Sequence, residues 1–281
     1  MPYPDKRYAR RLVYYNEFMD QQTQHKLAES LTADTTDIIP YLPYLLQDFW
    51  ELGSSPGDMA ALVKKYIDTN IHKRFLDLGC GKGAVGITLV EEFGVQVTGI
   101  DIIHEFIEEA RSKAQEHGVS ELTSFETGDI TETVKTKRGY DCVIFGAVGT
   151  VLGNPAELLP QLAQTIKQGG YILLDDAYIE ENATKIEVHA DTDYLPLSSW
   201  EKEFEHAELE VVARITNDDT THDIKEDYDE EFSWIEARAN ELAEQYPQHK
   251  EMFDHYVINQ RNEYDDLLGD VVGATWLLRK R

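Results

Sequence analysis

Short apolar runs alternate with amphipathic segments over the middle of the chain. Short runs bounded by glycine or polar residues predict strands at 74–78 and 96–100 and buried strands at 142–148 and 171–174, and 123–126 is a further strand candidate. Between them, apolar residues spaced three or four apart predict helices at 84–92, 104–117 and 155–167. Strand, helix and strand in this order imply right-handed crossovers. The pattern therefore predicts an α/β fold, with a parallel sheet covered by helices on both faces.

The two ends of the chain do not follow this alternation. The first 70 residues have a helical pattern, which prolines interrupt within the apolar stretch 38–50. Ser55 as an N-cap, followed by Pro56 and by Asp58 in the first turn, predicts a helix over 56–67. After residue 174 the patterns predict a helix at 199–206, a strand at 209–215, helices at 232–246 and 249–268, and a last strand at 274–278.

Charge narrows the range of partners. The 281 residues contain 26 Lys and Arg against 53 Asp and Glu, a formal net charge of −27. Nucleic-acid-binding proteins gather basic residues against phosphate, so this charge disfavours nucleic acid as a partner. The acidity is densest at 217–231, and such runs are usually solubilising loops.

Cysteine content and hydropathy indicate a cytoplasmic protein. Cys80 and Cys142 are too few for a disulfide framework and have no metal-type spacing. The N-terminus is charged without an apolar run behind it, so no signal peptide is expected. No apolar run approaches the length of a membrane span, so no membrane segment is expected either.

The segment Asp77–Gly83 joins a predicted buried strand to a predicted helix through three glycines. Glycines permit positive φ and carry no Cβ that would block a ligand, and the helix N-terminus presents unpaired N–H groups. Asp101 ends the next strand, where a carboxylate can accept both hydroxyls of a ribose. Asp129 follows the third strand and is suited to accept from an exocyclic amine. Because these strand ends converge, a nucleotide-like ligand is predicted there.

The order of four segments, 77–83, 97–101, 127–130 and 140–149, resembles the successive motifs of class I S-adenosylmethionine-dependent methyltransferases. The resemblance implies a Rossmann-like, doubly wound, seven-stranded sheet with an antiparallel last strand. It also implies a division into an N-terminal helical cap segment (1–55), an S-adenosylmethionine-binding core (56–217 and 274–281) and a helical insertion or lid (218–273).

The resemblance further implies which residues bind the cofactor, S-adenosylmethionine. The glycine loop would lie against its methionine part, Asp101 would take the ribose diol and Asp129 the adenine amine. The full implied set is Asp77, Gly79, Cys80, Gly81, Asp101, Ile102, Asp129, Ile130, Phe145 and Gly146.

A nicotinamide-dependent oxidoreductase is the competing interpretation of the same loop. Gly81–Gly86 satisfies G-x-G-x-x-G, and Asp101 lies about 20 residues further on. However, the glycine run starts at Gly79, and the acceptor Asp129 and the C-terminal strand pair belong to the methyltransferase pattern.

Methyl transfer depends mainly on positioning the acceptor, with a base where the acceptor is protonated. The candidate catalytic residues are His189, in a loop after the fifth strand, and Asp176, which has a structural or substrate-orienting role as its main alternative. Catechol-type relatives hold a metal between carboxylates after the fourth and fifth strands, but Phe145-Gly146 supplies none. No metal site is therefore expected. Cys142 is expected to be a core residue.

The insertion between the last two strands leaves and returns at the carboxyl edge of the sheet, so it should overhang the ligand site. Together with the N-terminal helices it is expected to form a lid over the acceptor. Candidate wall residues are Tyr15, Phe18, Trp50, Tyr178, Trp234 and Tyr256, each of which could instead be an ordinary packing aromatic.

These observations predict an enzyme that transfers a methyl group to oxygen or nitrogen of a small-molecule acceptor. An amine is one candidate, because the acidic stretch would favour a cation if it faced the pocket. A protein or RNA methyltransferase, and a non-catalytic cofactor-binding regulator, remain as alternatives. No motif specifies the acceptor or the oligomeric state.

Overall fold

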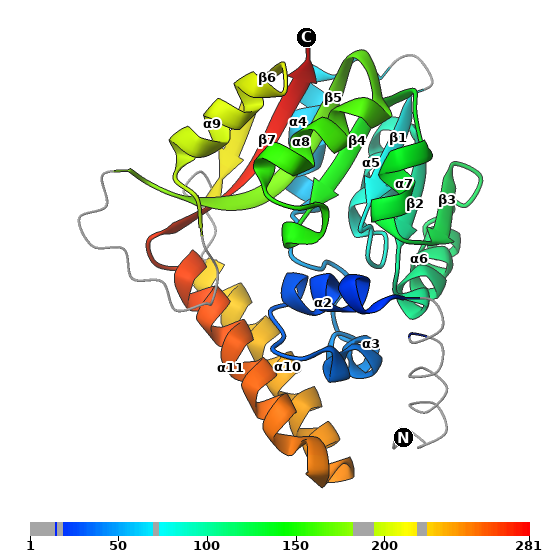
Figure 1. Ribbon diagram of the computed structural model, residues 1–281. Coiled ribbons are helices and arrows are strands. Elements are labelled where there is room, and N and C mark those ends of the chain that lie inside the picture. Colours follow the sequence, from blue (N-terminus) through cyan, green and yellow to red (C-terminus); the bar gives the residue numbers. More distant parts are fainter. Residues whose placement is uncertain (1–14, 16–18, 70–72, 182–193, 218–223) are drawn as a thin grey trace.

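The computed structural model of the protein describes residues 15, 19–69, 73–181, 194–217 and 224–281 (Figure 1). Its centre is a seven-stranded sheet made of β1 (Arg74–Leu78), β2 (Gln96–Asp101), β3 (Thr123–Thr127), β4 (Tyr140–Gly146), β5 (Ile166–Ile179), β6 (Leu209–Thr216) and β7 (Val271–Lys280). The strand order is β3-β2-β1-β4-β5-β7-β6. The strand pairs from β3 to β5 are parallel, and β7 runs antiparallel to both β5 and β6. The predicted α/β fold with an antiparallel last strand is confirmed.

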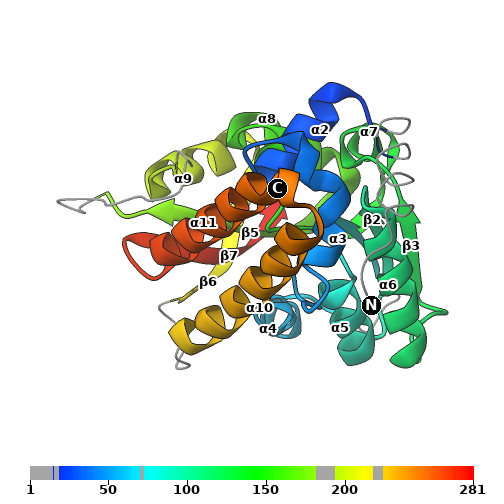
Figure 2. The same cartoon turned by 90° about the horizontal axis from the view of Figure 1, so that it is seen from below.

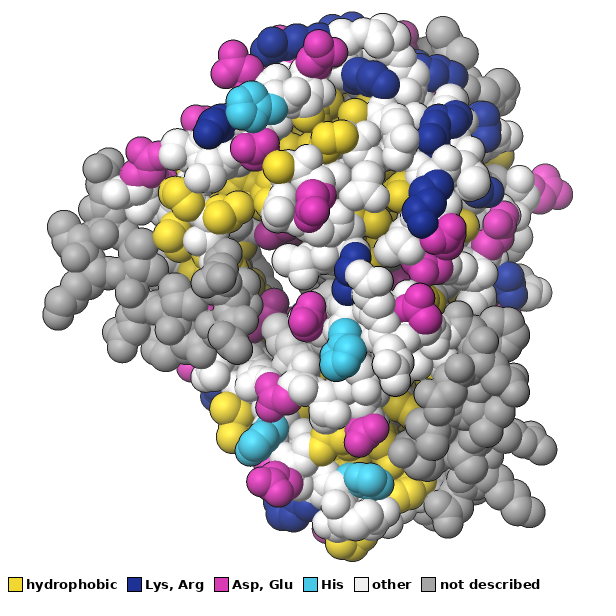
Figure 3. All heavy atoms as spheres, viewed as in Figure 1, with side chains coloured by type: hydrophobic (Ala, Val, Ile, Leu, Met, Phe, Trp, Pro, Cys, Tyr) yellow, Lys and Arg dark blue, Asp and Glu magenta, His cyan; other side chains and the backbone are white. Residues whose placement is uncertain are grey.

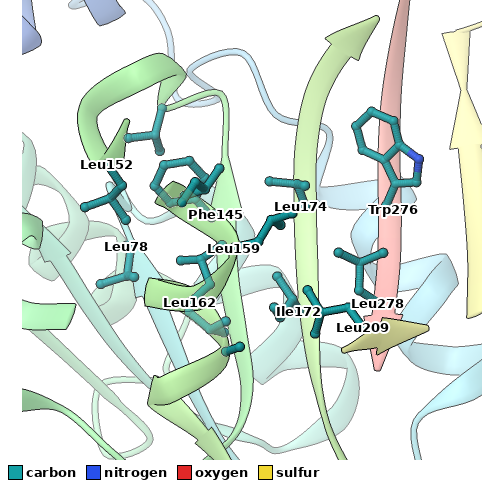
Figure 4. Packing of buried hydrophobic residues seen from close by; sticks show 14 of the residues in the cluster. Leu78, Phe145, Leu152, Leu159, Leu162, Ile172, Leu174, Leu209, Trp276 and Leu278 are labelled. Carbon is teal, nitrogen blue, oxygen red and sulfur yellow. The ribbon is translucent and has the colours of Figure 1, made fainter. Parts of the chain in front are cut away.

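Helices cover both faces of the sheet. They are α4 (Pro56–Tyr66), α5 (Ala84–Phe93), α6 (His104–Glu116), α7 (Ile130–Thr136), α8 (Pro155–Thr165) and α9 (Leu197–His206). Strand side chains alternate between the faces, so Phe75 packs with α4 and α5 while its neighbour Leu76 packs with α7 and α8. Figure 4 shows this second core, in which Phe145, Leu159 and Trp276 fill the space between the helices and the sheet.

Several predicted boundaries were wrong. The fifth strand begins at Ile166 rather than 171, because the main chain of Gly169 (φ +72°) belongs to an irregularity that shifts the pairing with β4. The fourth strand is Tyr140–Gly146 rather than 142–148, and Ala147 with φ +52° ends it. Helix α7 is too short, at 7 residues, to produce a visible periodicity. The predicted N-cap at Ser55 is confirmed, since its hydroxyl accepts from the Asp58 N–H at 3.2 Å.

A helical layer lies against the carboxyl edge of the sheet (Figures 1 and 2). Its N-terminal part is α2 (Gln21–Ser30), η1 (Thr36–Tyr41) and α3 (Leu42–Leu45), and η2 (Gly149–Leu152) borders it from the core. Its C-terminal part is α10 (Ile224–Gln245), η4 (Pro247–His249) and α11 (Lys250–Leu267), where α10 and α11 pack side by side. Helix α10 starts earlier than the predicted residue 232.

The two parts of the helical layer share one hydrophobic cluster. The Tyr41 ring contacts those of Tyr246 and Phe253, with centroids 5.4 and 4.9 Å apart. Ile103 and Phe106, which follow β2, belong to the same cluster and attach it to the core. The helical layer is therefore fixed above the ends of β1, β2 and β4. Within the described residues, no helix has the length and apolar character needed to cross a bilayer.

Candidate functional site

The glycine loop between β1 and α5 follows a path that only glycine adopts readily. Gly79, Gly81 and Gly83 have φ values of +73°, +50° and +81°. The N–H groups of Gly79 and Cys80 donate to the Ile100 carbonyl of β2 at 2.8 and 3.1 Å. This ties the loop to the sheet edge, and the N-terminal N–H groups of α5 follow directly.

Asp101, at the end of β2, holds the loop from the other side. Its two carboxylate oxygens accept from the N–H groups of Gly81 and Ile103, at 2.9 and 2.8 Å. Burial raises the pKa of this carboxyl to about 6. The glycine loop and Asp101, which the sequence predicted to lie together, are thus in direct contact. They lie at the point between β1 and β4 where the strand order of the sheet reverses.

Asp77 lies beneath the same loop and is 3% exposed. Its Oδ2 atom accepts no hydrogen bond from any described residue. Burial, with repulsion from Asp101 as the second cause, raises the pKa of Asp77 to about 7. A buried carboxylate oxygen without a partner is costly, so this position favours a ligand that donates to it.

The Asp77 carboxyl is expected to make the free protein less stable as the pH rises. Its folded pKa of about 7 lies above the ordinary value of 3.8, so the folded state binds the extra proton and stability falls between about pH 4 and pH 7. Asp77→Asn removes the buried charge but leaves an unsatisfied amide. We expect it to raise the unfolding free energy by about 2 kcal/mol at pH 8 and by little at pH 4, measured by urea denaturation. An equal effect at both pH values would contradict this account.

Asp129 caps α7, and its Oδ1 accepts from the Thr131 N–H at 2.7 Å. The Thr23 hydroxyl of α2 donates to Oδ2 at 3.4 Å, so the helical layer reaches this predicted adenine acceptor. Ile102 is partly exposed, and Ile130 is buried in the core cluster.

Of the remaining predicted cofactor contacts, Gly146 lies at the end of β4 and lines a small cavity beside the glycine loop. The Phe145 side chain is fully buried in the core, so only its main chain reaches the edge. Burial raises the pKa of the Cys80 thiol well above its usual range and also raises that of Cys142. Both thiols are therefore packing groups rather than nucleophiles, as the sequence predicted for Cys142.

Most of the predicted wall aromatics are packed within the protein. Tyr15 donates its hydroxyl to Glu105, Tyr178 packs against Trp276, and Tyr256 is buried in the helical layer. Trp234 contacts Phe49 edge-on, whereas Trp50 lines the cavity beside the glycine loop. Phe18 and His189 lie outside the described residues.

Asp176 of β5 faces acidic neighbours on α11. Burial raises the pKa of Asp176 to about 6 and that of Glu263 to about 7, and Asp266 and Asp176 repel the Glu263 carboxylate. Figure 3 shows a hollow between the sheet and the helical layer, with acidic side chains along its walls. In the part of the chain that the structure describes, no group of three or more His, Cys, Asp or Glu side chains is arranged to hold a metal ion.

The sequence did not point to three residues beside the glycine loop. Leu52 and Ser54 line the cavity from the N-terminal segment. Lys82 is 1% exposed, although a lysine between glycines suggests a surface position. No sequence signal links Leu52 or Ser54 to the loop, because the contact joins segments about 30 residues apart without periodicity.

Comparison with known proteins gives consistent matches. The model of a family described as a methyltransferase domain matches residues 70–240. The uncharacterized protein YjhP of Escherichia coli is 31% identical over 153 residues, which cover 52% of this chain and 60% of that protein. Ribosomal protein L11 methyltransferase of Shewanella woodyi is 29% identical over 138 residues, which cover 48% of this chain and 44% of that protein. The chain thus spans about half the length of these curated relatives.

The fold also matches solved structures. A methyltransferase from Thiobacillus denitrificans, described as S-adenosylmethionine-dependent and crystallised with S-adenosyl-L-homocysteine, superimposes with a TM-score of 0.69. The match covers 86% of this chain and 98% of that one, at 21% identity. At this identity the likeness establishes the shared fold.

Proposed function

The chain belongs to the family of methyltransferase domains, and on this basis we propose that it transfers a methyl group from S-adenosylmethionine to an oxygen or nitrogen atom of a small-molecule acceptor. The observation that carries the proposal is the glycine loop held by Asp101 above the unpartnered Asp77 oxygen. This combination offers close backbone approach, N–H donors and two carboxylates at one sheet edge.

The residues present fit the cofactor. A carboxylate has about four acceptor positions, and Asp101 uses two of them for backbone N–H groups. Two remain for the ribose hydroxyls. Asp129 likewise keeps acceptor capacity for the adenine amine beyond its contacts with Thr131 and Thr23. The buried Asp77 oxygen is matched to the ammonium of the methionine part.

When bound, the cofactor supplies a methyl group activated on a sulfonium sulfur. The chain's own residues then have to orient the acceptor and exclude water, which can supply much of the rate enhancement in such a transfer. The helical layer over the sheet edge serves both purposes. Asp176 is the residue we assign to orienting the acceptor, because at neutral pH its carboxylate is largely ionised and can accept the acceptor's proton or hydrogen bond. His189 remains a candidate base.

A cationic small molecule, such as an amine, is the acceptor class we favour. The acidic side chains Asp176, Glu263 and Asp266, which lie close to one another between β5 and α11, would attract a positive charge. The net charge of −27 disfavours nucleic acid. A protein acceptor is the second candidate, because one relative is named for methylating a ribosomal protein.

Calorimetric titration of the whole chain with S-adenosylhomocysteine and, separately, with NAD tests the cofactor. We expect micromolar binding of S-adenosylhomocysteine, about −8 kcal/mol, and none of NAD. Binding of NAD alone would overturn the proposal and identify a dinucleotide enzyme. Turnover is then measured with labelled S-adenosylmethionine against amines, phenols, carboxylic acids and ribosomal proteins. Methylation of phenols or carboxylic acids without amines would contradict the cationic acceptor.

A further inference from the structure

The segment Trp50–Ser54 forms one wall of the cavity beside the glycine loop. Trp50 and Ser54 face the cavity from this segment, and Asp77, Gly81 and Gly146 line it from the core. The cavity volume is about 30 Å³, room for about two water molecules. The N-terminal segment therefore completes a site that the core alone leaves open.

Three polar atoms around this cavity lack a hydrogen-bond partner among the described residues. They are Trp50 Nε1, Ser54 Oγ and Asp77 Oδ2, and all three are buried. Ser54 is 8% exposed and Asp77 3%. Buried polar atoms in folded proteins nearly always have a hydrogen-bond partner in the protein, in ordered water or in a ligand, so three such atoms around one cavity favour a polar ligand there.

The chemistry of the three atoms specifies that ligand. The indole N–H and the hydroxyl are donors, and Asp77 carries a carboxylate acceptor. A group that accepts two hydrogen bonds and donates at least one complements them. An α-amino acid has this pattern, since its carboxylate accepts and its ammonium donates.

The Ser54 side chain occupies space that a glycine of the core leaves free. A Cβ atom on Gly146 would lie 2.2 Å from Ser54 Oγ, so only glycine at the end of β4 leaves room for the hydroxyl. A Cβ on Gly81 would lie 2.9 Å from Leu52 Cδ1. Two glycines of the core thus accommodate side chains of the N-terminal segment.

Lys82 anchors the same segment from the glycine loop. Its Nζ donates to the carbonyls of Leu46 and Phe49 at 2.8 and 2.5 Å. This contact fixes the chain directly before Trp50. The segment is therefore held at the loop by bonds independent of any ligand.

We propose that Trp50 and Ser54 bind the α-amino-acid group of the cofactor and make the site select ligands that carry this group over those that lack it. This inference rests on the proposed function. Trp50 and Ser54 donate to the carboxylate, while Asp77 accepts from the ammonium. Because an amino-acid group is larger than the cavity, the side chains of Trp50 and Ser54 shift as the ligand enters, while the Lys82 contacts keep the preceding main chain in place.

The test compares S-adenosylhomocysteine with 5′-methylthioadenosine, which shares the adenosine and the thioether but has no amino acid. Both are titrated calorimetrically into the wild type, Ser54→Ala and Trp50→Phe. Each variant is expected to bind S-adenosylhomocysteine about tenfold more weakly and 5′-methylthioadenosine within twofold of wild type. Phenylalanine at position 50 keeps an aromatic ring against His117, whose ring centroid lies 5.0 Å from that of Trp50.

Matched controls are Ser112→Ala, on the exposed surface of α6, and Trp234→Phe, which contacts Phe49 and does not line the cavity. Both should leave the affinity ratio of the two ligands unchanged. An unchanged ratio in Ser54→Ala and Trp50→Phe, or an equal loss for both ligands, would overturn the inference while the proposed function stands. A wild type that binds neither ligand would refute the proposed function itself. Thermal melting identifies any variant that does not fold, and the other variant then decides.

Discussion

Asp101→Ala is expected to weaken S-adenosylhomocysteine binding at least a hundredfold. The carboxylate accepts from the N–H groups of Gly81 and Ile103, and in the proposed complex it also accepts from the ribose hydroxyls. The substitution removes the ligand contacts and the bonds that hold the loop. Hydrogen bonds to a charged group contribute about 1.5–3 kcal/mol each, so two lost ligand bonds alone reach about 3 kcal/mol, or a hundredfold.

Two comparison variants separate the contributions of Asp101. Asp101→Asn keeps one acceptor oxygen and should lose affinity to an intermediate degree. Glu126→Ala changes an exposed carboxylate on the neighbouring strand, and it should bind as the wild type does. Calorimetric titration measures all three, after thermal melting confirms that they are folded. Binding by Asp101→Ala within threefold of wild type would remove Asp101 from the site.

Periodicity predicted the sheet well because each central strand is buried on both faces. The apolar run 74–78 is the observed β1, and the run 96–100 differs from β2 only at its last residue, Asp101. Asp101 itself was predicted because it ends the strand that follows the glycine loop, where a carboxylate can accept from the hydroxyls of a ribose. The predicted boundaries of β4 and β5 were wrong because Ala147 and Gly169 have positive φ values, which alter the course of the main chain near those strands.

In the N-terminal wall of the site, Trp50 was predicted as a wall residue but Leu52 and Ser54 were not. Trp50 and Ser54 lie in a segment without regular structure, and their role depends on contacts with the glycine loop and β4. Such contacts follow from the tertiary fold rather than from local pattern. Tyr178 was predicted as a wall residue, yet it belongs to β5 and packs beside Trp276 in the core.

Lys82 could not be predicted from local pattern either. Its charge predicts a solvent-exposed side chain, whereas the tertiary fold buries it. Helix α3 ends at Leu45, and carbonyl groups at a helix end lack intrahelical partners. Lys82 Nζ donates to the carbonyls of Leu46, Gln47 and Phe49 and pairs with Glu109 Oε2 at 3.1 Å. Burial lowers the pKa of this lysine, but the ion pair with Glu109 opposes the shift. The ammonium thus binds the carbonyls of the segment directly after α3 and fixes this segment to the glycine loop.

Lys82→Met should therefore destabilise the folded protein strongly. Methionine keeps most of the aliphatic chain but leaves several carbonyls and Glu109 without their donor. Because the Glu109 side chain is 36% exposed, most of the loss comes from the buried carbonyls of Leu46 and Phe49. A buried acceptor left without its donor costs about 1–3 kcal/mol, so urea denaturation should show a loss of about 3 kcal/mol. Cleavage by a protease between residues 46 and 55 should also become faster, because the segment is no longer anchored.

Lys135→Met is the control, since Lys135 is an exposed lysine whose pairing with Glu132 contributes less than about 1 kcal/mol. If Lys82→Met unfolds at the same urea concentration as Lys135→Met, the lysine does not anchor the N-terminal segment.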